Sequence, residues 1–293
     1  MKAAFLPDRG VVKVSGEGAR DFLNGLLTTD MKLLRPGLGR FGALLTPQGK
    51  IIADFLITET PAGHGGGFLI DCPRALAQGL ADKLSIYKLR AKVAIENLTD
   101  SLGVLAAWDG DLAVMPDLAF ADPRSAELGW RILVPEGLKQ KVADLIGAEL
   151  TDSTSYEAHR IAAGVPRGGL DFIYGDAFPH ETNMDRLHGV DFDKGCYVGQ
   201  EVVSRMQHRG TARTRTVRVV LEDFSPEPGT TILAGDKAVG TMGATAGKIG
   251  LALIRIDRVA DALAAGLPLT AGGLAIRLVE PDDLLTAPKK TVA

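Results

Sequence analysis

The segment Asp-Phe-Asp-Lys-Gly-Cys-Tyr-Val-Gly-Gln-Glu, which occupies residues 191–201, concentrates more chemically informative residues than any other part of the chain. Apolar residues recur at intervals of four from Val198 to Met206, and this period predicts a helix that begins close to Val198. Cys196 would then lie just before a helix N-terminus and two residues after Lys194, and both the helix dipole and the ammonium favour an anion. The segment therefore indicates a cysteine whose thiolate is stabilised, while a small, buried and inert cysteine is the alternative.

A basic run follows this segment. Between Val202 and Leu221 there is no carboxylate, and the basic residues are Arg205, His208, Arg209, Arg213, Arg215 and Arg218. Such a run is either a solvated face or an electropositive wall for a polyanion, such as a polyglutamate tail, a phosphate or RNA. Because no aromatic residue is interleaved with these residues, a small anionic ligand is favoured over nucleic acid.

Other candidate sites are weaker. His180 and His188 lie among the carboxylates of Glu181, Asp185, Asp191 and Asp193, but the spacing matches no metal-binding motif. The glycine-rich stretch 63–67 is not followed by the lysine and helix start of a phosphate-binding loop, so we expect a hairpin tip there. Cys72 follows a strand-type run and is expected to be buried.

Composition excludes several classes of protein. The chain has 293 residues with 33 basic and 36 acidic side chains and a net charge of −3. This length predicts two or more sub-domains, and the charge balance argues against a protein coated by nucleic acid. The presence of only two cysteines excludes a disulfide scaffold and fits a reducing compartment. No apolar run is long enough for a membrane span or a signal peptide, so we expect a cytoplasmic protein.

Periodicity along the chain predicts an α+β protein with a C-terminal barrel. Strand-type runs and two helical stretches alternate through residues 1–100, and a looser version of the pattern follows through 101–212. From residue 213 to 286, short β-type runs separated by Pro-Gly, Gly-Asp and Gly-Gly turns predict a small antiparallel barrel. Residues 287–293 are expected to form a frayed tail.

The eight residues Lys194–Glu201 resemble the Lys-Gly-Cys-aromatic-x-Gly-Gln-Glu signature of the YgfZ-type folate-binding proteins. These are relatives of a mitochondrial iron–sulfur assembly factor and of the T-protein, the aminomethyltransferase of the glycine cleavage system. Supporting matches lie in residues 20–30, in the Pro-Gln-Gly segment 45–50, and around Arg160 and Glu181. The resemblance covers most of the chain.

The resemblance implies a T-protein-like cloverleaf: two α+β lobes within residues 1–212 and the C-terminal barrel, arranged around a tetrahydrofolate funnel. It also implies a bacterial accessory protein for 4Fe–4S proteins, with Cys196, Lys194 and Asp54 at its functional centre. The other motif residues are Gly195, Tyr197, Gly199, Gln200 and Glu201. The residues expected to contact the folate are Phe41, Tyr156, Arg160, Glu181 and Asn183.

The chain departs from the T-protein at two positions. An Asp-Asp pair that serves aminomethyl transfer is replaced by Ala53-Asp54, and a pterin-binding glutamate is replaced by Ala162. The loss of a buried hydrogen-bonding partner costs about 1–3 kcal/mol, so folate is not expected to bind tightly unless Glu181 substitutes. Both departures argue against a working aminomethyltransferase. Tyr156 could stack on a folate ring or pack in the core.

The leading hypothesis is therefore an accessory protein for the assembly, maintenance or repair of 4Fe–4S proteins, which binds a folate and uses Cys196. Such clusters normally take four thiolates, so a transient cluster would be shared with a partner. The expected partners are A-type iron–sulfur carrier proteins and client 4Fe–4S enzymes. The alternatives are a folate-dependent one-carbon transferase that uses Asp54, and a module whose basic run docks tRNA or an acidic partner.

Overall fold

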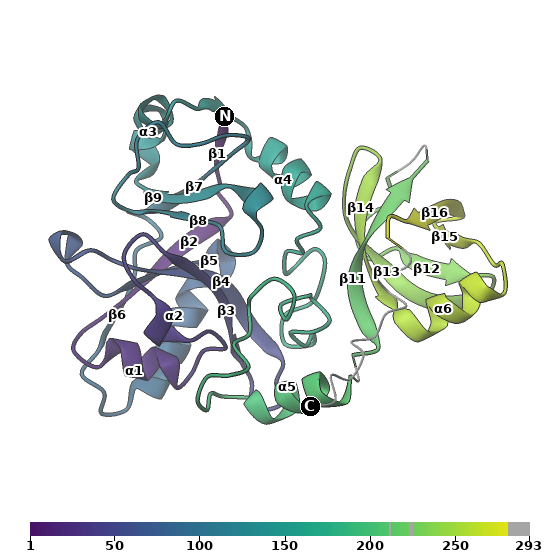
Figure 1. Cartoon of the computed structure of the whole chain (residues 1–293), viewed down its shortest axis with the longest axis horizontal. Coiled ribbons are helices and arrows are strands. Elements are labelled where there is room, and N and C mark those ends of the chain that lie inside the picture. Colours follow the sequence, from purple (N-terminus) through teal and green to yellow (C-terminus); the bar gives the residue numbers. More distant parts are fainter. Residues whose placement is uncertain (211, 223–224, 281–293) are drawn as a thin grey trace. The chain divides into compact units, whose positions relative to one another are not determined.

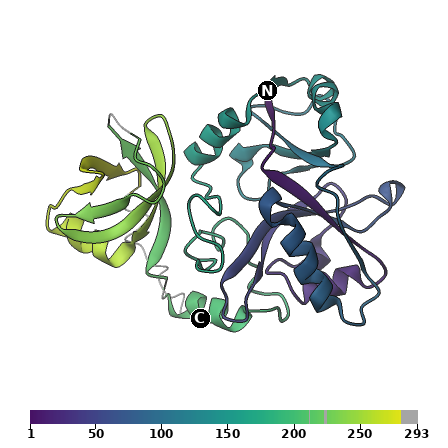
Figure 2. The ribbon, with the colours of Figure 1, turned by 180° about the vertical axis from the view of Figure 1, so that it is seen from behind.

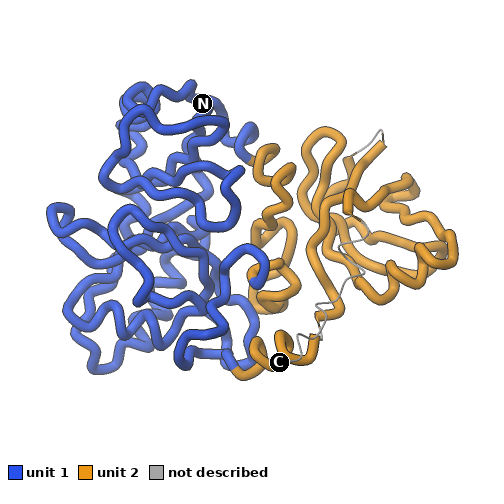
Figure 3. The backbone as a smooth tube through the Cα atoms, in the orientation of Figure 1, with its two compact units in different colours: residues 1–156, 185–200 blue, residues 157–184, 201–293 orange. Residues whose placement is uncertain are grey.

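The computed structural model describes residues 1–210, 212–222 and 225–280 (Figure 1). The chain divides into two compact units, each built from two separate segments (Figure 3). The first unit holds Met1–Tyr156 and Asp185–Gln200, and the second holds Glu157–Met184 and the chain from Glu201 onward. The tail expected at 287–293 and the last residues of the predicted barrel region lie outside the described residues.

The first unit contains two five-stranded sheets, of which the first has the order β3-β4-β5-β2-β6. Its strands are β2 (Arg9–Ser15), β3 (Gly39–Leu45), β4 (Ile51–Glu59), β5 (Phe68–Pro73) and β6 (Ala94–Asn97). All neighbouring strands are antiparallel, so alternate residues point to opposite faces. One face carries Val12, Phe55 and Ile70 into a core with helices α1 (Ala19–Asn24) and α2 (Arg74–Lys88). The view from behind shows α2 lying across this sheet (Figure 2).

The second sheet has the order β10-β1-β7-β9-β8. Its strands are β1 (Lys2–Phe5), β7 (Gly103–Trp108), β8 (Ala119–Ala121), β9 (Trp130–Val134) and β10 (Glu149–Thr151). Helix α3 (Lys139–Ile146) contributes Ala143 and Ile146 to the core on one face of this sheet. The N-terminal strand β1 pairs with β7 and β10, so it belongs to a sheet whose other strands begin at Gly103 or later.

The remaining faces of the two sheets pack against each other. A Cβ atom added to Gly39 on β3 would overlap the ring of Phe120 on β8, which shows how closely the layers approach. Asp71 on β5 and Arg131 on β9 form an ion pair across the same interface. The first unit is therefore a helix–sheet–sheet–helix sandwich with charged residues between its sheets. Short 3-10 turns occur at Met31–Leu33, Ala62–His64, Ala126–Leu128 and Glu136–Leu138.

The second unit is dominated by a closed barrel of order β11-β14-β13-β12-β15-β16, which confirms the predicted C-terminal barrel. Its strands are β11 (Thr214–Leu221), β12 (Thr231–Ala234), β13 (Lys237–Ala246), β14 (Ile249–Arg255), β15 (Leu269–Ala271) and β16 (Leu274–Leu278). Apolar residues such as Val219, Ile232 and Ile254 fill the interior together with residues of helix α6 (Ile256–Ala264). Helix α4 (Ser153–Ala162) begins in the first unit and ends in the second, and α5 (Gln200–Arg209) leads toward the barrel.

The irregular segment before the barrel is attached to strand β13 through Asp171. The β13–β14 register shifts between Met242 and Thr245, and there the N–H of Ala244 donates to Oδ1 of Asp171 at 2.7 Å. A Cβ atom at Gly243 would overlap this carboxylate, so the position requires glycine. No helix in the described part of the chain has the length and apolar character needed to span a bilayer.

Candidate functional site

Asp191 is the first of three anchors of residues 191–199, which we call the motif loop. Both of its carboxylate oxygens accept from Nη2 of Arg40 at 2.5 Å. Its Oδ2 also accepts from the backbone N–H of Asp30 at 2.5 Å and from the hydroxyl of Thr29 at 3.2 Å. The start of the motif loop is therefore fixed to β3 and to the chain that follows α1.

Lys194 is the second anchor. Its side chain is buried, and Nζ donates to the carbonyl oxygens of Asn24, Leu27 and Thr29 at 2.8, 2.6 and 2.9 Å. All three ammonium protons thus have acceptors. Burial lowers the pKa of Lys194 to about 8, against the opposing charges of two nearby aspartates, so the ammonium form still prevails at neutral pH. Lys194 therefore holds the backbone in place. Its three hydrogen bonds all go to backbone carbonyl oxygens, so none of them supports the prediction that its charge stabilises a thiolate at Cys196.

Gly199 is the third anchor. It has a φ of +83°, and a Cβ atom there would lie 2.5 Å from the carbonyl oxygen of Thr46. The motif loop thus ends pressed against the Pro-Gln-Gly turn between β3 and β4, and only glycine fits at this position. The neighbouring Tyr197 is buried, with its ring 5.1 Å from Nζ of Lys194, and Val198 packs against the core of the first sheet.

Between these anchors the loop exposes Gly195 and Cys196. The prediction that a helix begins close to Val198 is correct to within two residues, because α5 begins at Gln200. Cys196 therefore precedes the first helical residue by four positions, beyond the turn over which a helix terminus acts strongly. The position of Cys196 is determined by the anchors on either side of it. Cys196 is exposed and is therefore not the small, buried cysteine of the alternative interpretation, whereas Cys72 is buried as expected.

The two cysteines are predicted to differ sharply toward a thiol reagent. Cys196 is exposed, whereas Cys72 has no exposed surface and burial raises its pKa to about 12. We expect Ellman's reagent to label one thiol per chain under native conditions, and Cys72 to react on the order of 10³-fold more slowly because it needs local unfolding. Two thiols should react in denaturant. Rapid labelling of both thiols in the native protein would contradict the burial of Cys72.

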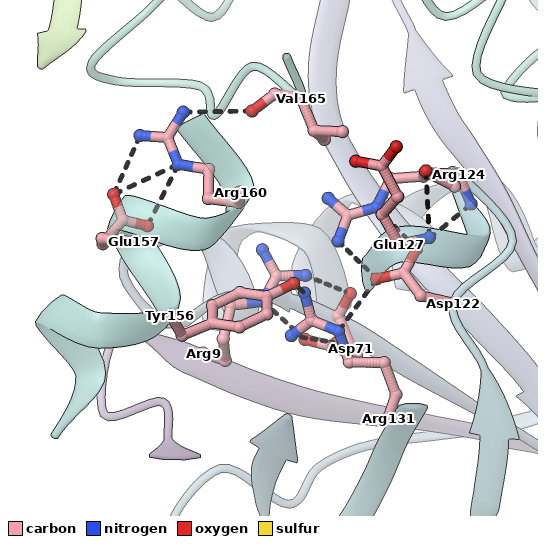
Figure 4. Close-up of polar contacts among 11 residues, drawn as sticks. Arg9, Asp71, Asp122, Arg124, Glu127, Arg131, Tyr156, Glu157, Arg160 and Val165 are labelled. Carbon is pink, nitrogen blue, oxygen red and sulfur yellow. Dashed lines mark hydrogen bonds and ion pairs between the residues drawn. The ribbon is translucent and has the colours of Figure 1, made fainter. Parts of the chain in front are cut away.

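A buried polar network lies between the two sheets of the first unit (Figure 4). From the first sheet, Arg9 donates through Nε to Oδ1 of Asp71 at 2.5 Å and through Nη2 to its carbonyl oxygen at 2.7 Å. From the second sheet, Arg131 donates through Nε to Oδ2 of Asp122 at 3.1 Å. Nη1 of Arg131 lies 3.8 Å from Oδ2 of Asp71, which joins the two halves.

Tyr156 belongs to this network. Its hydroxyl accepts from Nη2 of Arg131 at 2.5 Å, the Arg131 guanidinium lies 4.8 Å from its ring centroid, and Trp108 packs edge-on at 5.5 Å. Burial raises the pKa of Tyr156, so the phenol stays neutral. Phe41 is also buried, and the guanidinium of Arg124 lies 5.7 Å from its ring centroid. Both aromatic side chains expected to contact folate therefore make contacts within the first unit.

Asp54 contributes charge to the same network. It is buried on β4. Burial acts to lower the pKa of Arg9, but the carboxylates of Asp71 and Asp54 outweigh it and raise that pKa. The pKa of Arg124 is raised in the same way, against burial, by Asp122 with a smaller contribution from Asp54. Asp54, the acid that a one-carbon transferase would need, thus interacts electrostatically with Arg9 and Arg124.

Asp122 predicts how stability responds to acid. Burial acts to raise its pKa, but Arg124 and Arg131 outweigh that effect and hold the pKa at about 2. Because this value lies below that of an unfolded aspartate, Asp122 stabilises the fold above pH 4 by about 2 kcal/mol, and this contribution is lost as the pH falls from 4 to 2. Urea unfolding should show a deficit in Asp122→Asn at pH 7 that narrows by pH 3. A constant deficit would contradict this assignment.

The other predicted folate contacts lie in the second unit. Arg160 is buried and pairs with Asp171. It also pairs with Glu157 at 2.8 Å and donates to the carbonyl oxygen of Val165 at 3.1 Å (Figure 4). Two further residues bind backbone groups. Oε2 of Glu181 accepts from the N–H of Phe178 at 2.8 Å, and the amide of Asn183 donates to the carbonyl oxygen of Thr216 at 2.8 Å.

The basic run does not form one charged face. Arg215 is buried and donates to the carbonyl oxygen of His180 at 2.9 Å. Arg205 pairs with Glu201 within α5. The exposed members of the predicted run are Arg205, His208, Arg209 and Arg213. The described residues contain no group of three or more His, Cys, Asp or Glu side chains that could hold a metal ion.

Three kinds of similarity to known proteins agree with this architecture. Residues 213–284 match the family described as CAF17, C-terminal beta-barrel domain. The glycine cleavage system aminomethyltransferase T from Bartonella henselae aligns with a TM-score of 0.73 at 16% identity, over 94% of this chain and 84% of that one. This likeness establishes an aminomethyltransferase fold and confirms the predicted fold class.

Curated relatives decide the family. The mitochondrial iron–sulfur cluster assembly factor IBA57 homolog of Pyricularia oryzae is 33% identical over 91% of this chain and 75% of its own length. The chain belongs to the IBA57 family of iron–sulfur cluster assembly factors. The human member is 31% identical over 87% of this chain and 77% of its own length. The homolog of Mycosarcoma maydis is 37% identical over 74% of this chain, which spans 56% of that protein.

Membership of the IBA57 family confirms the predicted relation to iron–sulfur assembly factors and corrects two finer predictions. The predicted cytoplasmic location is contradicted, because these relatives are named as mitochondrial proteins. The relatives also carry the IBA57 name, so the bacterial, YgfZ-type assignment is not supported.

Proposed function

We propose that this IBA57-family protein assists the assembly or maintenance of 4Fe–4S proteins by offering Cys196 as a ligand to a cluster shared with a partner. The observation that carries the proposal is the three-point anchoring of the motif loop by Asp191, Lys194 and Gly199, with Cys196 exposed between the anchors. A held, exposed thiol can meet a cluster without a large loss of conformational entropy.

The chemistry would be ligand exchange at iron. The Cys196 thiol releases its proton to solvent, and the thiolate donates an electron pair to a cluster iron. The ligand that it displaces leaves with its own electron pair and takes up a proton, so the oxidation state of the cluster is unchanged. Because the other cysteine is buried and 4Fe–4S clusters normally take four thiolates, a partner must supply the other ligands. A-type carrier proteins and client 4Fe–4S enzymes are the partners that we propose.

A deletion strain tests this function. We expect 4Fe–4S enzymes to lose most of their activity in cells that lack the protein, with 2Fe–2S proteins as the control and recovery on re-expression. Full activity of the 4Fe–4S enzymes in the deletion strain would contradict the proposal.

The residues present do not fit the folate contacts implied by the T-protein fold. Ala162 replaces the pterin-binding glutamate, and Tyr156, Arg160, Glu181 and Asn183 already bind groups in their own unit. Folate binding remains a prediction, and we expect it to be weak. Calorimetric titration with tetrahydrofolate checks this, with Tyr156→Phe as the matched variant that keeps the ring. Tight binding that is lost in Tyr156→Phe would restore the folate funnel and the transferase alternative.

A further inference from the structure

The C-terminal end of α2 exposes two large aliphatic side chains. Ile86 is 70% exposed and Leu89 is 88% exposed, which are among the highest values for large apolar residues in the described part of the chain. Ile86 lies in the last turn of α2 and Leu89 is the residue that caps it, so both belong to the exposed end of the helix. Water-exposed aliphatic residues gathered at one place are typical of an interaction site.

The backbone of Leu89 is strained. Its φ is +45° and its ψ is −104°, and the N–H of Ala91 donates to the carbonyl oxygen of Lys88 at 2.8 Å. This is the geometry of a turn whose second residue is normally glycine. Leu89 gains little packing in return, because most of its side chain faces solvent. Strain without a packing benefit is typical of functional positions.

The same end of α2 is positively charged. From Lys83 to Ile95 the chain has four basic residues and no carboxylate. Arg90 and Lys92 are exposed, and Lys92 lies 3.9 Å from the carboxylate of the exposed Glu17. Together Ile86, Lys88, Leu89, Arg90 and Lys92 form a surface that we call the α2 tip.

We infer that the α2 tip is a docking site for a protein partner that presents an apolar recess within an acidic surface. Aliphatic anchors surrounded by charges that complement the partner are the usual arrangement at protein interfaces. A bilayer fits less well, because even one myristoyl chain gives only marginal membrane binding and two aliphatic side chains bury less. Single-stranded nucleic acid fits less well, because it favours aromatic platforms and none of the five side chains of the α2 tip is aromatic.

Photo-crosslinking tests the inference in cells that express the full chain. Ile86 is replaced by p-benzoylphenylalanine, and Leu145, an exposed leucine on α3, is replaced in the matched control. We expect a crosslink between position 86 and a segment of a partner protein that has a net negative charge. The double variant Arg90→Glu, Lys92→Glu should abolish this product. Equal products at both positions, a lipid or RNA adduct, or a contacted segment without net negative charge would overturn the inference.

Leu89→Gly separates docking from folding. Glycine relieves the strained turn, so we expect a melting temperature at or above that of the wild type, and a crosslink yield from position 86 that falls about fivefold or more. Undiminished crosslinking or a lower melting temperature would overturn the inference. Cys196→Ser leaves the α2 tip intact and should crosslink normally from position 86. A failure of the proposed cluster function can therefore be distinguished from a failure of docking at the α2 tip.

Discussion

Cells that carry Cys196→Ser as their only copy of this protein are expected to lose 4Fe–4S enzyme activity while the variant itself stays folded. Loss of groups that merely support metal ligands costs about 10–100-fold in metal affinity or activity, so we expect loss of a ligand to lower activity at least tenfold. Because Cys196 is exposed, its substitution should change the free energy of unfolding by less than about 0.5 kcal/mol. Enzyme assays in extracts and urea unfolding of the purified variant measure the two effects.

The neighbouring glycine supplies the control for this experiment. A Cβ atom at Gly195 would meet nothing within 4 Å, so Gly195→Ala should fold and support activity like the wild type. Wild-type activity in Cys196→Ser would refute a role for the thiol. Equal loss in both variants would show that the shape of the loop matters and the thiol does not.

Lys194→Met is expected to give the largest loss of stability among the motif variants. Methionine keeps the length and the apolar stem but leaves the carbonyl oxygens of Asn24, Leu27 and Thr29 without their donor in a buried site. Buried polar groups that lose their partner cost about 1–3 kcal/mol each, so we expect a decrease of about 3 kcal/mol or more in the free energy of unfolding. Urea unfolding at pH 7 measures it.

Lys92→Met is the matched control for Lys194. The side chain of Lys92 is 87% exposed, so its loss should change the free energy of unfolding by less than about 0.5 kcal/mol. If both methionine variants unfold at the same urea concentration, the three hydrogen bonds of Lys194 do not anchor the motif loop.

Short-range patterns predict the barrel and the strands of the first sheet. The barrel strands are separated by turns that contain Pro-Gly, Gly-Asp and Gly-Gly, which mark boundaries within a few residues. The start of α5 is predicted to within two residues, and apolar spacing does not report that Gly199 has a positive φ and lies against Thr46. Strand β1 is missed because only four residues form it and its partners lie far along the chain.

The anchors and the buried network could not be predicted because their partners are distant in sequence. The acceptors of Lys194 lie 165 to 170 residues earlier and are backbone carbonyl groups, which leave no sequence signal. The network had a weak signal: Asp71 and Arg131 interrupt apolar strand runs, and a charge in such a run requires a buried partner. Which aspartate meets which arginine depends on how the two sheets pack.

Native mass spectrometry of this protein mixed with a cluster-loaded A-type carrier tests the central claim most directly. Cys196 as a shared ligand predicts a complex of the two proteins that retains one iron–sulfur cluster, and predicts that Cys196→Ser forms no such complex while Gly195→Ala does. A cluster-containing complex that forms equally well with Cys196→Ser would contradict the claim.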